Sequence, residues 1–548
     1  MSRVIFFGLI LTSSICMAQM PPLSPPVDPP GNASTPEKVK LGKILYWDEQ
    51  LSATKTVACA SCHILSSGGV DPRSSVSNPL STNAGFDGIM NTADDITGSM
   101  GVPESGADGN YIYNPLHGYN SRVTGRRAPS SINAGYAPEL FFDGRAGGQF
   151  YDPITNDLVL ISGAALESQV LAPPTNPVEM GHNSRNWNDV VNSVKTSTPL
   201  ALSPLVSEQM SQWINSQNYF QLFKKAFGTN EITAPKIAMA IAAYERSLYS
   251  NQAPIDFMIA NQDPSFLTLQ ERVGFQLFQS QGCNTCHSSA LFSNTEFQNI
   301  GVSPNAEDSG RFAVTGIEAD RGKFKTTSLR NLQYRTSFMH NGRFSTLEEV
   351  VDFYDRGGDY ANPNLDTRIQ PLFLSVTQKE SLVAFLGRPL TDPRVTNETG
   401  PFAHPSLYAG SSREPQITGV GVAGTSAKIP QVTAIEPPLL GNQNFTVAVE
   451  NALSDANSFF VVDLADPGTT ALPAIGLNYA TKQLSNTADG HASLSIALPS
   501  DTAMIGSTLY ARWYVEDAVA PNGYAISPLI EFTLFAASDY VYVDSFED

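Results

Sequence analysis

The sequence predicts a mainly α-helical protein of two related domains, followed by a C-terminal all-β domain with a sandwich-like strand pattern. Three observations support this prediction. Apolar residues recur at helical spacing in several segments before residue 400, a short cysteine and histidine motif occurs twice there, and short alternating segments begin near Gln416. The length is consistent with several domains, because 548 residues are more than one ordinary domain contains.

The chain begins with a predicted signal peptide at residues 1–18. Arg3 precedes an apolar run from Val4 to Ile15, and Ala18 is a suitable cleavage residue. This run is too short for a permanent anchor, and no later stretch is long enough to span a membrane. We therefore expect a periplasmic protein, joined to its leader by a proline-rich, extended tether at residues 19–35.

The first domain is predicted at residues 36–255 and the second at residues 256–400. A threonine cap and a proline start a helix at Thr35, and Tyr219–Tyr249 is also strongly helical. Residues 66–111 are rich in Gly, Ser, Asn and Asp and are expected to form an irregular loop. The helical segment Val273–Leu277 repeats the pattern of Leu41–Leu45, which indicates that the two domains are related. The second domain ends with a helix at Val376–Leu386.

The last domain is predicted at residues 415–548. Strand patterns occur at Phe445–Val449, Phe459–Asp463 and Leu509–Val515, with turn residues between them, as in a β-sandwich. This part of the sequence contains no cysteine. We expect a non-catalytic appendage.

The repeated motif is Cys-x-x-Cys-His, and its two copies use every cysteine after residue 20. Its members are Cys59, Cys62 and His63 in the first copy, and Cys283, Cys286 and His287 in the second. This spacing is typical of covalently attached c-type haem, in which two thiols bond to the porphyrin and the histidine binds iron. One four-cysteine zinc site, a thioredoxin-like redox pair or disulfides are the alternatives, and none of them explains a histidine after both second cysteines. The sequence thus predicts two covalent haems.

The net charge of −19 restricts the partners. It argues against nucleic acid and anionic membrane surfaces, and it suits a small basic protein as a partner.

Several further segments, in their order around both motifs, resemble the bacterial di-haem cytochrome c peroxidase and MauG family. The matching segments are Arg127–Ala134, Phe141–Ala146, Leu166–Gln169, Asn176–Gly181, Phe324–Asn331, Phe338–Gly342 and Phe353–Gly358. The resemblance covers residues 35 to 400 and neither the tether nor the last domain. It implies that peroxide reacts at an open face of the first haem.

The resemblance places Gln169, Pro173 and Glu179 at that open face. A carboxylate there would move a proton between the peroxide oxygens, an amide would orient the peroxide, and the proline would keep the sixth iron position vacant. The alternatives are an ordinary surface carboxylate for Glu179 and a loop proline for Pro173. Some members block this position with a loop histidine until reduction opens it. His117 is the candidate for that role here, and a solvated loop histidine is the alternative.

At the second haem, the resemblance suggests Tyr354 as an iron ligand. The peroxidase branch has methionine fourteen residues after the histidine that corresponds to His340, whereas MauG has tyrosine, as this chain does. A phenolate lowers the potential of the iron and a thioether raises it. A buried aromatic residue on an amphipathic helix is the alternative for Tyr354.

Two departures from the family pattern limit the comparison. The tryptophan between the haems is Phe142 here, and phenylalanine is much harder to oxidise. The asparagine that binds calcium in the family is Arg127 here, and a cation would repel the metal, so we do not predict calcium.

The resulting prediction is a di-haem peroxidase that reduces hydrogen peroxide with electrons from a small cytochrome c or cupredoxin. One alternative is a MauG-like enzyme that oxidises tryptophan or tyrosine of a protein substrate. The other is a non-enzymatic electron carrier, in which the protein coordinates both irons fully.

Overall fold

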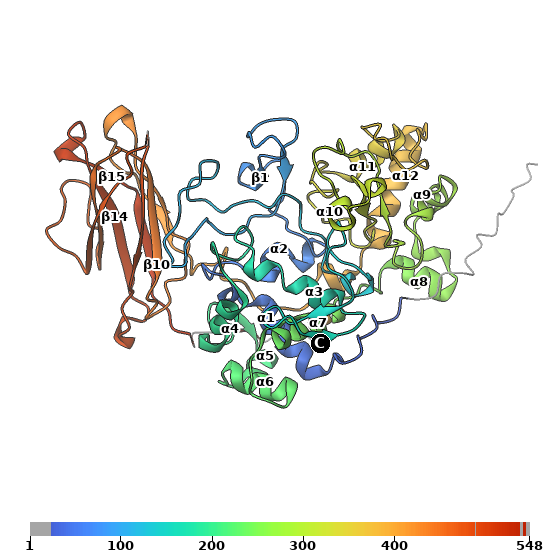
Figure 1. The fold of residues 1–548 in the computed structure, drawn as a ribbon, viewed down its shortest axis with the longest axis horizontal. Helices are drawn as coiled ribbons and strands as arrows, with labels where there is room; N and C mark the ends of the chain where they lie inside the picture. Colours follow the sequence, from blue (N-terminus) through green and yellow to red (C-terminus); the bar gives the residue numbers. More distant parts are fainter. Residues whose placement is uncertain (1–22, 488, 538–540, 544–548) are drawn as a thin grey trace, which may run out of the picture.

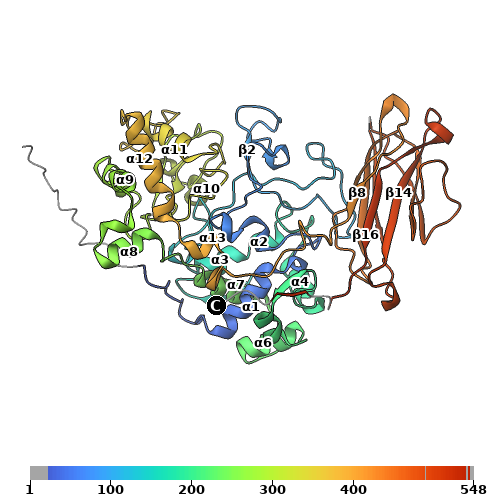
Figure 2. The ribbon, with the colours of Figure 1, turned by 180° about the vertical axis from the view of Figure 1, so that it is seen from behind.

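The computed structural model describes residues 23–487, 489–537 and 541–543. The predicted signal peptide lies outside these residues. Helices fill the centre and one end of the molecule, and the β-rich region forms the other end (Figures 1 and 2).

The central helical part is built around α1 and α7. Its helices are α1 (Pro36–Trp47), α2 (Cys59–Cys62), α3 (Ala165–Val170), α4 (Trp187–Thr196), α5 (Glu208–Ile214), α6 (Tyr219–Phe227) and α7 (Ala234–Ser247). The Thr35 side chain caps α1, as predicted. The helix expected over Tyr219–Tyr249 is two helices instead. Gly228 ends α6 in the left-handed conformation, and Thr233 caps α7.

The second helical part contains α8 (Pro254–Asn261), α9 (Leu269–Ser280), α10 (Phe312–Thr315), α11 (Leu347–Asp355), α12 (Val376–Leu386) and α13 (Pro393–Thr396). The predicted helix at Val376–Leu386 is confirmed as α12. Helices α9 and α12 pack together through Phe275, Phe278 and Phe385, whose ring centroids lie 5.1 to 5.3 Å apart across the contact.

The repeated sequence pattern corresponds to a repeated helix contact. Gly42 on α1 lies against α7 so closely that an added Cβ would be 1.9 Å from the Ala240 carbonyl oxygen. Gly274 on α9 approaches α12 equally closely, and its Cβ would be 1.9 Å from the Ser381 carbonyl oxygen. Only glycine allows two backbones to approach this closely. In both parts the helix that carries this glycine is followed in the sequence by a Cys-x-x-Cys-His motif.

The C-terminal region is β-rich, and the three predicted strand segments are confirmed in β10, β11 and β14. One sheet has the order β13-β10-β9, and a larger sheet has the order β12-β11-β14-β16-β8, with β15 paired to β14. The bounds are β8 (Gln416–Thr418), β9 (Gln431–Thr433), β10 (Phe445–Ala452), β11 (Asn457–Asp463), β12 (Asn478–Gln483), β13 (Gly490–Ile496), β14 (Thr508–Glu516), β15 (Tyr524–Ile526) and β16 (Leu529–Thr533). One hydrophobic core takes residues from both sheets, including Val447 and Trp513. A sandwich-like arrangement stays a prediction.

Direct contacts connect the β-rich region to the central helices. Tyr408, in the segment before β8, bridges the two parts, since its N–H donates to Glu49 Oε2 at 2.6 Å and its hydroxyl donates to the Glu436 carbonyl oxygen at 3.0 Å. Tyr111 Oη also donates to Glu436 Oε1 at 3.1 Å. Strand β17 (Val541–Val543) returns to pair in parallel with β5 (Leu205–Ser207) of the helical part.

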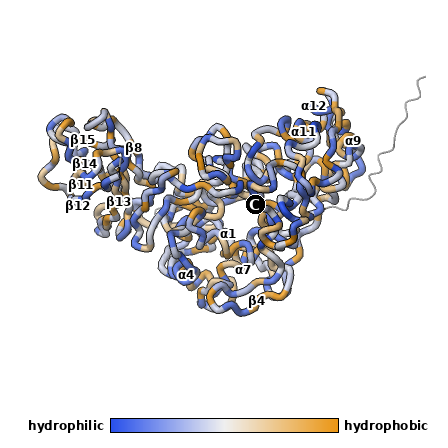
Figure 3. Tube along the Cα trace, turned by 45° about the horizontal axis from the view of Figure 1, so that its top comes forward, coloured by the Kyte–Doolittle hydropathy of each residue, from blue (hydrophilic) through white to orange (hydrophobic). Residues whose placement is uncertain are grey.

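Hydrophobic and hydrophilic residues are interspersed along the trace in Figure 3. Over the residues that the structure describes, no helix is both long and apolar enough to cross a bilayer.

A buried ion pair joins α3 to α7. Glu167 Oε2 lies 2.6 Å from Arg246 Nη2, and both side chains are at most 4 % exposed. Asn32, from the segment before α1, also donates to Glu167 Oε1 at 2.6 Å. The pair therefore fixes the separation of α3 and α7.

We predict that Glu167→Gln lowers the free energy of unfolding by roughly 3–5 kcal/mol, because it leaves the Arg246 charge buried without a partner. Urea unfolding followed by circular dichroism measures this. Glu318→Gln is the matched control, since it breaks an exposed pair with Arg321 and should change nothing measurable. Equal unfolding curves for the two variants would contradict the structural role of the buried pair.

Candidate functional site

The first Cys-x-x-Cys-His motif forms a short helical turn with an oriented histidine. Cys59 and Cys62 bound α2, and His63 follows directly. His63 Nδ1 lies 3.2 Å from the Gly69 carbonyl oxygen. A carbonyl only accepts hydrogen bonds, so Nδ1 carries the proton and Nε2 keeps a lone pair that is available to a metal.

The second motif repeats this geometry. Cys283 starts a 3₁₀ turn, Cys283–Thr285, and His287 Nδ1 lies 3.1 Å from the Phe292 carbonyl oxygen. All four thiols are free. Burial raises the pKa of Cys62 to about 12 and that of Cys283 to about 11, so the thiols are protonated at neutral pH.

Each motif lines a hollow of its own, so the cysteines do not combine into one four-cysteine zinc site. The first hollow, of about 470 Å³, is lined by Cys59, Cys62, His63, Gln169, Pro173 and Glu179, among others. Two adjoining cavities, of about 720 and 1200 Å³, share His63 and Gln169 with it. The structure therefore brings three of the predicted site residues to the first motif.

Short local elements position these three residues. Gln169 lies on α3, Pro173 starts the 3₁₀ turn Pro173–Thr175, and Glu179 follows that turn. Asn176 Nδ2 donates to Glu179 Oε1 at 3.0 Å and orients the carboxyl group. Burial raises the pKa of Glu179, and the charge of Arg145 opposes this shift.

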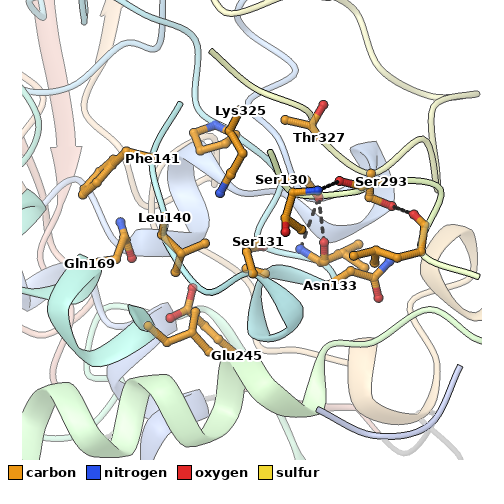
Figure 4. A pocket seen from close by; sticks show the side chains of 18 of the residues that line it. Ser130, Ser131, Asn133, Leu140, Phe141, Gln169, Glu245, Ser293, Lys325 and Thr327 are labelled. Carbon is orange, nitrogen blue, oxygen red and sulfur yellow. Dashed lines mark hydrogen bonds between the residues drawn. The ribbon is translucent and has the colours of Figure 1, made fainter. Parts of the chain in front are cut away.

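Glu245 is a second carboxyl group of this hollow, and sequence reasoning missed it. Its side chain points from α7 into the adjoining cavity of about 720 Å³, which it also lines (Figure 4), and Oε2 is buried with no hydrogen-bond partner among the described residues. Burial raises its pKa to about 8, so the group is neutral at pH 7. The sequence signal was Glu245–Arg246, a charged pair that follows a largely apolar stretch of the helix.

The second hollow is larger, about 1610 Å³, and its lining includes Cys283, Cys286, His287 and Tyr354. Tyr354 projects from α11, and burial, together with the nearby thiols, raises its pKa above the ordinary value. The hollow also contains His340, which sequence reasoning used only as a reference position. The His340 ring stacks on Phe324 at a centroid distance of 3.6 Å.

Phe142 and Arg127 line both the second hollow and the 1200 Å³ cavity beside His63. The two hollows are therefore neighbours, and the residues that depart from the family pattern lie between them. The Phe142 ring is edge-on to His340, with centroids 6.4 Å apart.

His117 does not line these cavities. It lies in a loop that packs against the β-rich region, where Tyr113 stacks on His491 at a centroid distance of 3.9 Å. Its backbone N–H donates to Asn114 Oδ1 at 3.1 Å. A role of His117 as an iron ligand stays a prediction.

The sequence matches the family described as di-haem cytochrome c peroxidase over residues 36–264. It is 31 % identical over 361 residues to the methylamine utilization protein MauG of Methylorubrum extorquens, which covers 65 % of this chain and 79 % of that protein. The chain belongs to the di-haem cytochrome c peroxidase family. This confirms the family resemblance, and haem is the cofactor that membership implies.

Other relatives of this di-haem peroxidase agree. The cytochrome c551 peroxidase of Nitrosomonas europaea is 28 % identical over 356 residues, which is 64 % of this chain and 81 % of that protein. Among solved structures, a MauG-like protein associated with microbial copper homeostasis aligns with a TM-score of 0.49 and 24 % identity, covering 69 % of this chain and 96 % of that one. The family match and the curated relatives, without that structural alignment, show that the chain is an oxidoreductase of the peroxidase type.

Proposed function

We propose that this protein is a periplasmic peroxidase that reduces hydrogen peroxide to water, with electrons from a small donor cytochrome c or cupredoxin. One observation carries the proposal. The first hollow brings a Cys-x-x-Cys-His turn, an amide and an oriented carboxyl group around one space.

The residues in both hollows fit a covalently bound haem. Each has two free thiols and an imidazole whose Nε2 is left available by a backbone carbonyl behind Nδ1. Cys59, Cys62 and His63 would hold the first haem, and Cys283, Cys286 and His287 the second. When bound, haem supplies an iron that binds peroxide and accepts and donates electrons.

Glu179 is the proposed proton carrier of the first hollow. In its ionised form it would take a proton from one oxygen of a peroxide held in the hollow and return it to the other oxygen. The O–O bond would break as that oxygen leaves as water, and the remaining oxygen would become the second water with two protons and the two electrons that the donor protein supplies. Asn176 keeps the carboxyl group oriented during both steps. Gln169 donates a hydrogen bond that positions the peroxide, and Pro173 contributes no side-chain group that binds a metal.

The second hollow is proposed as the entry point for electrons, with Tyr354 as an iron ligand. The acidic surface charge attracts a basic donor protein and speeds its encounter. Relatives named as peroxidases and as MauG both match the chain. We propose peroxide reduction as the main function, and oxidation of a partner's tryptophan or tyrosine is the alternative that Tyr354 and the MauG relatives support.

We predict that Glu179→Gln slows the reaction with hydrogen peroxide by about 10²–10⁴-fold, because the amide cannot accept the proton. Stopped-flow mixing of the haem-loaded protein with peroxide measures this rate. Glu208→Gln, on the surface helix α5, removes the same charge far from the hollow and should react as the wild type does. Equal rates for all three proteins would eliminate Glu179 as the proton carrier and, with it, the proposed use of the first hollow.

The rate should also depend on pH through Glu179. Its pKa is raised by burial, and it acts in the ionised form, so the rate falls on acidification at a pH above 4.5, the value for an exposed glutamate. The Glu179→Gln variant should lack this acidic limb. An identical limb in the variant would assign the titration to another group.

We predict that Tyr354→Met raises the potential of the second haem by on the order of 100 mV, within the roughly 0.8 V range that axial ligands span. A thioether favours the reduced iron, whereas a phenolate favours the oxidised iron. Spectroelectrochemical titration measures the change. Tyr360→Met, six residues further along and outside the lining of the hollow, is the control. Unchanged potentials in both variants would remove Tyr354 as a ligand.

A further inference from the structure

Two arginines lie at the second hollow without a carboxylate partner. Arg127 and Arg335 are 4 % and 8 % exposed. Arg127 Nε donates to the Met339 carbonyl oxygen at 3.1 Å, and Arg335 Nη2 donates to the Arg330 carbonyl oxygen, also at 3.1 Å. Arg127 Nη1 and Arg335 Nε are buried and have no hydrogen-bond partner in the part of the chain that the structure describes. We call these two residues the arginine pair.

The arginine pair differs from Arg246, Arg330 and Arg512, three other buried arginines that pair with carboxylates. Arg246 is paired with Glu167, and Arg330 is paired with Asp256 at 2.6 Å. Burial lowers the pKa of Arg127 to about 10, and burial together with the Arg127 charge lowers the pKa of Arg335 to about 9. No carboxylate opposes either shift. Two buried positive charges that repel each other are costly unless an anion neutralises them.

The location of the pair indicates where that anion lies. Both arginines line the second hollow, and Arg127 also lines the cavity beside His63. Arg335 packs on the turn that holds the first motif, since a Cβ added to Gly68 would be 3.2 Å from Arg335 Nε. The next residue, Gly69, provides the carbonyl that orients His63. The pair therefore lies at the boundary of the two proposed haem sites.

We propose that the arginine pair binds the propionate carboxylates of the haems where the two hollows meet. This inference rests on the proposed function, because it requires haem in both hollows. A guanidinium group presents two parallel N–H donors that match the two oxygens of a carboxylate. Carboxylates at this boundary would satisfy the free donors and neutralise both charges. Two arginine side chains of this protein would thereby provide the positive charge between the haem sites.

A positive charge beside a haem favours the reduced iron, so the pair also sets the potentials. Arg335 lines the second hollow and not the cavity beside His63, whereas Arg127 lines both. Loss of Arg335 should therefore act mainly on the second haem, and loss of Arg127 should act on both.

The test uses the haem-loaded protein and its Arg127→Gln and Arg335→Gln variants. We expect each substitution to lower the affected midpoint potential by about 59 mV, a tenfold change in the one-electron equilibrium. The propionate bending bands in the resonance Raman spectrum should shift as well. Arg127→Lys and Arg335→Lys keep the charge and should restore most of the potential. Arg185→Gln is the control, because Arg185 is equally buried but donates to the Pro174 and Met180 carbonyl oxygens away from the second hollow.

Unchanged potentials and unchanged propionate bands in both glutamine variants, with both haems bound, would overturn the inference and leave the proposed function intact. A wild-type protein that carries no haem after expression with a maturation system would instead refute the proposed function. The lysine variants retain the buried charge and keep the test available if a glutamine variant does not fold.

Discussion

The rest of the structure depends on one contact, the direct packing of two helix backbones at a glycine. At Gly42 the backbone of α1 touches α7, and at Gly274 the backbone of α9 touches α12. Helix α1 leads to the first Cys-x-x-Cys-His turn, while α7 carries Glu245 into the same hollow. The spacing of the two helices therefore sets the width of the hollow, and any side chain at Gly42 would have to push them apart.

Buried charges differ between the helices that pack against one another, called the framework here, and the residues that line the hollows. In the framework, buried charges are paired, as between α3 and α7. Around the hollows, several buried polar atoms have no partner in the described part of the chain, including those of Glu245, Arg127, Arg335 and Asn133. Native proteins rarely leave such atoms unsatisfied, so their concentration at the hollows indicates that a bound group completes these sites.

The sequence predicted features whose cause is local. The two motifs, the capped helix α1 and the strands β10, β11 and β14 depend on spacing and periodicity that a short segment contains. The break between α6 and α7 could also have been predicted from the sequence, because a glycine such as Gly228 commonly ends a helix. The apolar residues on both sides of Gly228 obscured this signal. The grouping of Gln169, Pro173 and Glu179 came from the family resemblance, and the structure places them together at the first motif.

What the sequence could not predict depends on contacts between distant segments. Arg335 is one arginine among many until the fold buries it beside Arg127. Glu245 belongs to a helix whose sequence predicts a buried core helix. Only the position of α7 in the fold shows that the Glu245 carboxyl group faces the first hollow. The loop that carries His117 is held against the β-rich region, a contact that joins residues more than 300 positions apart.

The central claim is that the chain holds two covalently bound haems in neighbouring hollows. The most direct measurement is the intact mass of the denatured protein after expression with a haem maturation system. We predict the mass of the mature polypeptide plus two haems, and the mass of the bare polypeptide, or of one haem adduct only, would contradict the account.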